Sequence, residues 1–140
     1  MQLKHLKRTF TAAMLTLVAT AAHAEDKRLT AKIPFAFRAV GSDLPSGTYK
    51  LAAISPGSGT MELSNVDTGK TVFIPSKGGG VTETKNVRPR LIFKCVDQEG
   101  CSLATAWSGT GTGMEFVTPP PTATQRERLE TVYLDRVKLK

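Results

Sequence analysis

The stretch Leu91–Trp107, "LIFKCVDQEGCSLATAW", contains two strand-like runs on either side of a turn. "LIFKCV" and "CSLATAW" are short and largely apolar, and "DQEG" between them is rich in turn-forming residues. Short apolar runs bounded by turn signals are typical of β-strands. We therefore predict an antiparallel hairpin over residues 91–107, and an all-β fold around it.

The only two cysteines, Cys95 and Cys101, flank this turn. A structural zinc site needs four ligands, and a redox catalyst uses Cys-x-x-Cys at a helix N-terminus, whereas five residues intervene here. Antiparallel strands bring such positions to about 5 Å, within the range that a disulfide can bridge. We predict a Cys95–Cys101 disulfide, with free thiols as the alternative. The entropic model gives so small a loop a stabilisation of about 2 kcal/mol or less.

Similar strand-like runs continue outward in both directions, at residues 29–40, 48–54, 60–66, 71–75 and 114–117. "DTGK" at 67–70 predicts a tight hairpin turn, because Gly69 can supply the positive φ that such turns require. Pro34 predicts an edge strand or a strand start, because it lacks a backbone donor. Seven or eight strands at this spacing predict a small antiparallel β-barrel or β-sandwich, formed by one domain over residues 25–140.

The tail of the chain carries mixed signals. Thr124 and Glu127 fit a capping box, which predicts a short helical turn near residues 125–130. The following stretch is strand-like in composition, so we predict a closing strand near residues 131–139. The aromatic residues alternate along the predicted strands, which favours core positions over a stacking surface. These residues are Phe35, Phe37, Tyr49, Phe73, Phe93 and Trp107.

The first 24 residues have the pattern of a secretory signal peptide. Lys4, Lys7 and Arg8 precede a largely apolar run of 13 residues, and "AHA" ends at Ala24. A run of 13 is shorter than the ~20 residues that span a bilayer, so we predict cleavage after Ala24 and no membrane span in the mature chain. Localisation is then periplasmic or secreted.

Cleavage would change the chemistry of the chain more than its size. It removes three basic and no acidic residues, which takes the net charge from +7 to +4. It also removes both histidines, His5 and His23. A mature chain without imidazole excludes Ser-His-Asp and Cys-His catalysis, as well as histidine metal sites. We predict no catalytic residues, no metal and no cofactor.

Several short motifs together resemble a group of small secreted bacterial β-proteins with the patterns Pro-Phe-x-Phe, Leu-Pro-x-Gly-x-Tyr, Leu-x-Phe and Trp-Ser. The likeness covers most of residues 30–130, and it implies an architecture and no particular activity. The cysteines at 95 and 101 depart from the pattern of that group. The matching residues are Pro34, Phe35, Phe37, Leu44, Pro45, Gly47, Tyr49, Leu91, Phe93, Trp107 and Ser108.

Two motifs invite a catalytic or nucleotide-binding interpretation. Asp67-Thr68-Gly69 is the tripeptide of aspartic proteases, which a single-copy chain could use only as a homodimer. Lys70 follows it and would disturb a shared-proton site, so a hairpin turn is favoured. "SGTGTG" at 108–113 lacks the Gly-Lys-Ser/Thr of a P-loop and does not open a helix, so a loop at a sheet edge is favoured.

Basic residues cluster on the long polar loop at 76–90 and on the strand after it. They predict a surface that contacts anions, such as lipid phosphates or acidic polysaccharide, with nucleic acid the least expected partner; an ordinary solvated loop is the alternative. The residues are Lys77, Lys85, Arg88, Arg90 and Lys94.

Composition and motifs together favour a non-catalytic function. We predict an exported β-domain that acts as a structural or interaction module of the cell envelope, meeting anionic envelope components or another envelope protein. The alternative is a binder of a small apolar or glycan ligand, inside a barrel or on the sheet face around Trp107. An open cavity of ligand size would favour the binder, and a filled interior would favour the module.

Overall fold

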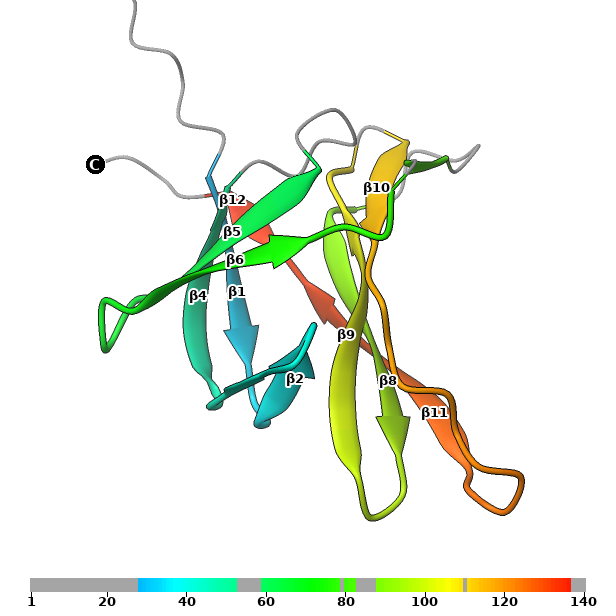
Figure 1. Cartoon of the computed structure of the whole chain (residues 1–140). Coiled ribbons are helices and arrows are strands. Elements are labelled where there is room, and N and C mark those ends of the chain that lie inside the picture. The colour runs from blue at the N-terminus through cyan, green and yellow to red at the C-terminus, as the bar shows by residue number, and fades with distance from the viewer. Residues whose placement is uncertain (1–27, 53–58, 79, 83–87, 110, 137–140) are drawn as a thin grey trace, which may run out of the picture.

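The computed structural model describes residues 28–52, 59–78, 80–82, 88–109 and 111–136, and this part of the chain is all-β without helix (Figure 1). The predicted signal peptide lies outside these residues. The strands are β1 Leu29–Ile33, β2 Phe37–Ala39, β3 Ser42–Leu44, β4 Gly47–Ala52, β5 Thr60–Asn65, β6 Thr71–Pro75, β7 Val81–Thr82, β8 Arg90–Val96, β9 Gly100–Trp107, β10 Thr112–Glu115, β11 Glu127–Tyr133 and β12 Asp135–Arg136.

These strands form two sheets that pack in a sandwich-like arrangement. One has five strands in the order β12-β1-β4-β5-β6. The other has seven, with β11-β8-β9-β10-β7 as its main path and the β2–β3 hairpin attached through β9. The described strands do not close into a barrel, so of the two predicted architectures the sandwich fits. Twelve strands replace the predicted seven or eight, because bends divide two runs into β1 and β2 and into β11 and β12, and because the short strands β3 and β7 form outside the predicted runs.

Pro34 accounts for one of these bends. The run at 29–40 becomes β1 and β2, and Pro34 lies in the break directly after Ile33. A residue without an N–H cannot continue the ladder, so pairing stops there. The prediction that Pro34 marks an edge strand or a strand start is wrong, because β1 lies inside its sheet and pairs with both β4 and β12.

The core lies between the sheets and is filled by alternating side chains from both. Phe93 is fully buried at its centre, with ring centroids 5.0 Å from Phe35 and 5.3 Å from Phe37 in edge-to-face arrangements. Phe37 also meets the buried Tyr49 at 5.4 Å. Such pairs add about 0.5–1.5 kcal/mol each beyond the burial of their apolar area. The interior therefore has the character of a packed core.

Phe73 is an exception to the predicted aromatic core. On β6 the neighbouring Ile74 faces the interior and is 1 % exposed, whereas Phe73 points outward and is 67 % exposed. Alternation along a strand defines two faces, and in β6 the buried face carries Val72 and Ile74. The core prediction for Phe73 is therefore wrong.

The predicted helical turn near 125–130 is also wrong. Residues 127–133 form β11, which pairs with β8 in an unbroken antiparallel register from Glu127↔Val96 to Tyr133↔Arg90. Gln125 instead ends a turn in which its N–H donates to the carbonyl of Thr122. A capping box is a local signal of about 1 kcal/mol, and a full strand of ladder contacts outweighs it.

One continuous segment, residues 127–136, contributes a strand to each of the two sheets. β11 belongs to the seven-stranded sheet and β12 to the five-stranded sheet, and only Leu134 lies between them (Figure 1). Leu134 is buried, and its N–H donates to the carbonyl of Pro89. Strands that switch sheets through such a bend form the corners of sandwiches. The bend at Leu134 therefore fixes how the sheets meet.

Candidate functional site: the outer face of the seven-stranded sheet

The predicted Cys95–Cys101 disulfide is present and joins directly opposed residues of β8 and β9. Their Cα atoms are 3.9 Å apart, closer than the predicted 5 Å. Cys95 is buried in the core, and Cys101 is half-buried at the start of β9. A disulfide indicates an oxidising environment, which is the environment that exported proteins encounter.

We expect the disulfide to pin local register and to contribute little to global stability. Reduction should lower the free energy of unfolding by about 2 kcal/mol or less, because the loop is short and β8 and β9 keep their other neighbours. The β-rich circular dichroism should persist at room temperature. Thermal unfolding with and without reductant measures the loss, and a thiol-reactive dye should label no cysteine in the folded oxidised protein. Labelling of both cysteines there would contradict the prediction.

A bulge in β9 decides which way Trp107 points. Phe93 pairs with Leu103, and Ile92 pairs with Thr105, so Ala104 is an extra residue on β9. One extra residue transfers every later side chain to the other face. A regular register from the cysteines would place Trp107 in the interior. The bulge places it instead on the face directed away from the core, which we call the outer face.

The register on the outer face brings two of the predicted sites together. Tyr133, Arg90 and Trp107 form one row across β11, β8 and β9. The guanidinium carbon of Arg90 lies 5.3 Å from the centroid of the Trp107 ring, within cation–π range. Arg88 lies 4.9 Å from the centroid of the Tyr133 ring. The predicted ligand residue and part of the predicted basic cluster are therefore one site.

Gly113 of β10 completes this row and determines how the indole lies. Gly113 pairs with Trp107. A Cβ atom at this position would lie 2.7 Å from Cε3 and 3.0 Å from Cδ2 of the indole, and 2.9 Å from the carbonyl oxygen of Ala106. The indole therefore lies flat against the backbone of β10. Its Nε1 is buried and has no hydrogen-bond partner among the described residues.

The five residues of the predicted basic cluster do not all meet. Arg90 and Lys94 share the outer face, because they are separated by an even number of positions on β8. Arg88 is exposed and forms an ion pair of 3.0 Å with Asp135 at the corner. Lys77 lies after β6, where its N–H donates to the carbonyl of Glu115. Lys85 falls outside the described residues.

One further cation, Arg38, lies on this face and was not predicted from the sequence. Arg38 of β2 lies opposite Ser102 of β9 in parallel pairing, and it forms an ion pair of 3.1 Å with Asp43. The parallel contact between β2 and β9 joins segments more than sixty positions apart, and no local pattern signals it. Arg38, Ser102 and Lys94 form a second row of the outer face, parallel to the Trp107 row.

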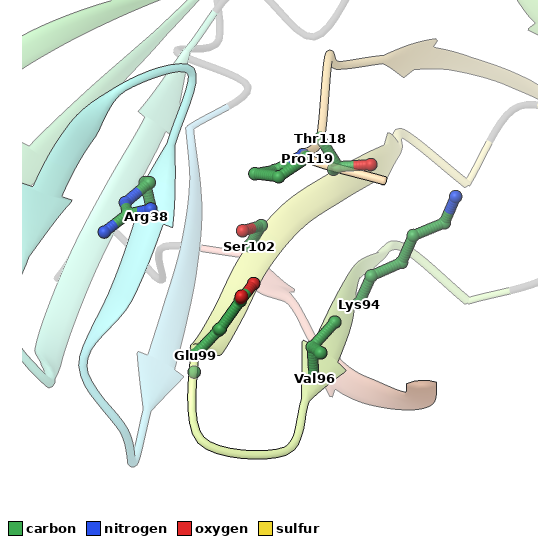
Figure 2. A pocket seen from close by; sticks show the side chains of 8 residues that line it. Arg38, Lys94, Val96, Glu99, Ser102, Thr118 and Pro119 are labelled. Atoms are coloured by element: carbon green, nitrogen blue, oxygen red, sulfur yellow. The ribbon is translucent and has the colours of Figure 1, made fainter. Parts of the chain in front are cut away.

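This second row borders a small hollow. Figure 2 shows the side chains of Arg38, Ser102 and Lys94 around it, with Glu99 from the turn and Thr118–Pro119 above β9. Its volume is about 10 Å³, the space of about one water molecule. A wider open hollow of about 290 Å³ lies beside it, lined partly by the apolar side chains of Phe37 and Leu44 and by Cys101. Both hollows open at the surface, and the wider one reaches the edge of the core at Phe37 and Leu44.

Asp67 occupies the hairpin turn between β5 and β6, as the turn interpretation predicts. The side-chain oxygen of Asn65, which is buried, accepts hydrogen bonds from the N–H groups of Asp67 at 2.9 Å and Thr68 at 3.1 Å. Gly69 has the required positive φ of 72°. Local turn geometry therefore accounts for the whole motif.

The part of the chain that the structure describes has neither a cluster of metal ligands nor a helix that could span a membrane. The described residues include no group of three or more Cys, Asp or Glu side chains placed to hold a metal ion. Within the same residues, no helix has the length and apolar character needed to cross a membrane.

Comparison with known proteins adds no family to this description. No family model matches the chain, and the searches of curated proteins and of solved structures likewise give no match.

Proposed function

We propose that this chain is an exported, non-catalytic interaction module of the cell envelope, which contacts anionic envelope components through its outer face. The observation that carries the proposal is the shared row of Arg90 and Trp107, with Lys94 two rows away on the same face. Guanidinium groups and half-buried aromatic rings are the side chains that concentrate binding energy at interaction surfaces. The filled interior supports a surface function over an internal ligand site.

Export is part of the proposal and has its own support. The basic, apolar and small-residue segments of residues 1–24 follow the order of a signal peptide. The disulfide is stable in an oxidising compartment and is rare in the cytosol of most organisms. Both observations agree with an envelope or extracellular location.

Acidic polysaccharide is the anionic component that we favour. Lys94 and Arg90 supply charges for the carboxylates of such a polymer, and the half-buried Trp107 holds the Arg90 guanidinium over its ring, 5.3 Å from the centroid. We expect the full protein to bind immobilised polygalacturonate weakly, and to be released as salt shortens the Debye length to about 8 Å near 0.15 M. Lys94→Gln and Trp107→Ala should each weaken retention.

Lys50→Gln is the matched control, because Lys50 is an exposed lysine of β4 on the other sheet. Lys94→Gln should reduce retention several-fold more than Lys50→Gln, although both remove one charge. Equal losses would mean that retention depends only on the net positive charge of the protein, and they would contradict the proposal. Vesicles of anionic lipid serve as the second arm, and binding to them alone would replace the polysaccharide with a lipid surface.

The open hollow beside Phe37 and Leu44 favours a second candidate, a small apolar or neutral glycan ligand on the sheet surface. Such a ligand would bind without salt dependence. Calorimetric titration with neutral oligosaccharides separates this candidate from the first, because Lys94→Gln should leave the binding of a neutral ligand unchanged.

A further inference from the structure

The exposed edges of the two sheets are protected to different degrees. β7 and β12 have two residues each, and β3 has three. β6 has five, and it ends in Pro75. β11 is an edge of seven residues with no proline and no bulge in its pairing with β8. Short length, proline and bulges are among the devices that blunt sheet edges, and β11, although it carries charged side chains, is the one long edge among the described strands with none of these three.

The backbone N–H and C=O groups of β11 point alternately toward β8 and toward the free edge of the sheet. At its ends, the N–H of Asp97 donates to the carbonyl of Arg126, and the N–H of Leu134 donates to the carbonyl of Pro89. Both bonds follow the β11–β8 register, and the residues that they involve at the two ends of β11, Arg126 and Leu134, are even-numbered. In an antiparallel ladder, alternate residues direct both backbone groups to the same side. The odd-numbered residues of β11 therefore direct their N–H and C=O groups toward the free edge.

The side chains of β11 are complementary to a second copy of the same strand. In an antiparallel pair centred on Leu129, Arg128 of each copy lies opposite Glu130 of the other, and the odd-numbered residues supply the hydrogen bonds. Leu129 is 63 % exposed and would meet its own copy. A pair centred one residue later would oppose Glu130 to Glu130, and one centred one residue earlier would oppose Arg128 to Arg128. Like charges directly opposed destabilise a sheet.

We propose that the protein forms a two-fold symmetric dimer in which two β11 strands pair through their free edges, centred on Leu129, and join the two seven-stranded sheets. Figure 1 shows β11 in one chain. A two-fold interface uses the same patch on both subunits, as this self-complementary strand allows. Arg128 already contacts Glu130 within one chain at 3.2 Å and Asp97 at 3.5 Å. Its side chain therefore lies on the same face as the residue that it would meet in the partner. The inference does not depend on the proposed function.

Charge exchange tests the interface in the full, oxidised protein. We expect sedimentation velocity at tens of micromolar to show a dimer for the wild type. Arg128→Glu places four acidic side chains at the centre of the interface and should weaken the dimer at least tenfold. Glu130→Arg should do the same with four basic side chains. The double variant R128E/E130R restores opposite pairs and should recover the dimer.

Mixing the two single variants gives a result that misfolding of either variant could not produce. R128E and E130R should each be monomeric alone and should form a dimer of the two variants when combined in equal amounts. Circular dichroism checks that each remains β-rich. A wild type that stays monomeric at several hundred micromolar overturns the proposal. So does a dimer that neither single charge reversal weakens.

Discussion

Phe93→Ala is expected to lower the free energy of unfolding by about 3–5 kcal/mol. Phe93 is fully buried between the sheets, and its ring contacts those of Phe35 and Phe37. The substitution removes a large apolar side chain and leaves a cavity beside the rings of Phe35 and Phe37. Domains of this size have stabilities of about 5–15 kcal/mol, so the loss is a large fraction of the total. Urea unfolding followed by tryptophan fluorescence measures it.

Phe73→Ala provides the matched control. It removes the same side chain from β6, where the ring is 67 % exposed. Its cost should be below about 1 kcal/mol, because surface substitutions seldom cost more. Comparable losses for the two variants would mean that Phe73 is covered in solution and that the assignment of the two faces of β6 is wrong.

Gly113→Ala is expected to cost about 1–3 kcal/mol and to displace the indole of Trp107. The new methyl group would lie 2.7 Å from the indole and 2.9 Å from the carbonyl oxygen of Ala106, so neighbouring atoms must move. Trp107 is the only tryptophan, so the emission spectrum of the protein reports its environment. We expect the emission to shift toward that of a more exposed indole.

A double-mutant cycle with Trp107→Ala separates the two clashes. If the indole is the main obstacle, Gly113→Ala should cost clearly less in the Trp107→Ala background. The remaining cost reflects the contact with Ala106. An unchanged emission spectrum, together with additive costs, would show that Trp107 does not lie against Gly113.

The sequence predicted those parts of the fold that follow from local patterns. The hairpin around the cysteines, the disulfide and the turn at Gly69 all depend on residues close together in the chain. The helical turn at 125–130 failed because a local capping signal competed with pairing to β8, which lies some thirty positions away. Phe73 was misplaced because strand alternation defines two faces without identifying the buried one.

The candidate site was harder to predict than the fold. Arg90 and Trp107 were each identified, but their contact depends on the bulge at Ala104. Counting back from Cys95 and Cys101 in a regular register places Ala106, not Trp107, opposite Arg90. One extra residue thus converts a predicted core tryptophan into a surface one. Arg38 could not be found at all, since its place depends on the parallel pairing of β2 with β9.

The corner at Leu134 has a consequence for the order in which the chain can fold. β1 completes its pairing only with β12, and the hydroxyl of Thr30 donates to the carbonyl of Asp135 across 105 positions. Contacts so distant in sequence close late and slowly, because the entropy of the intervening chain must be lost first. A ribosome must therefore synthesise residues 127–136 before either sheet can be completed. Until then the nascent polypeptide can form local hairpins such as β4–β5–β6 and β8–β9, but it lacks the strands that join the two sheets at their corner.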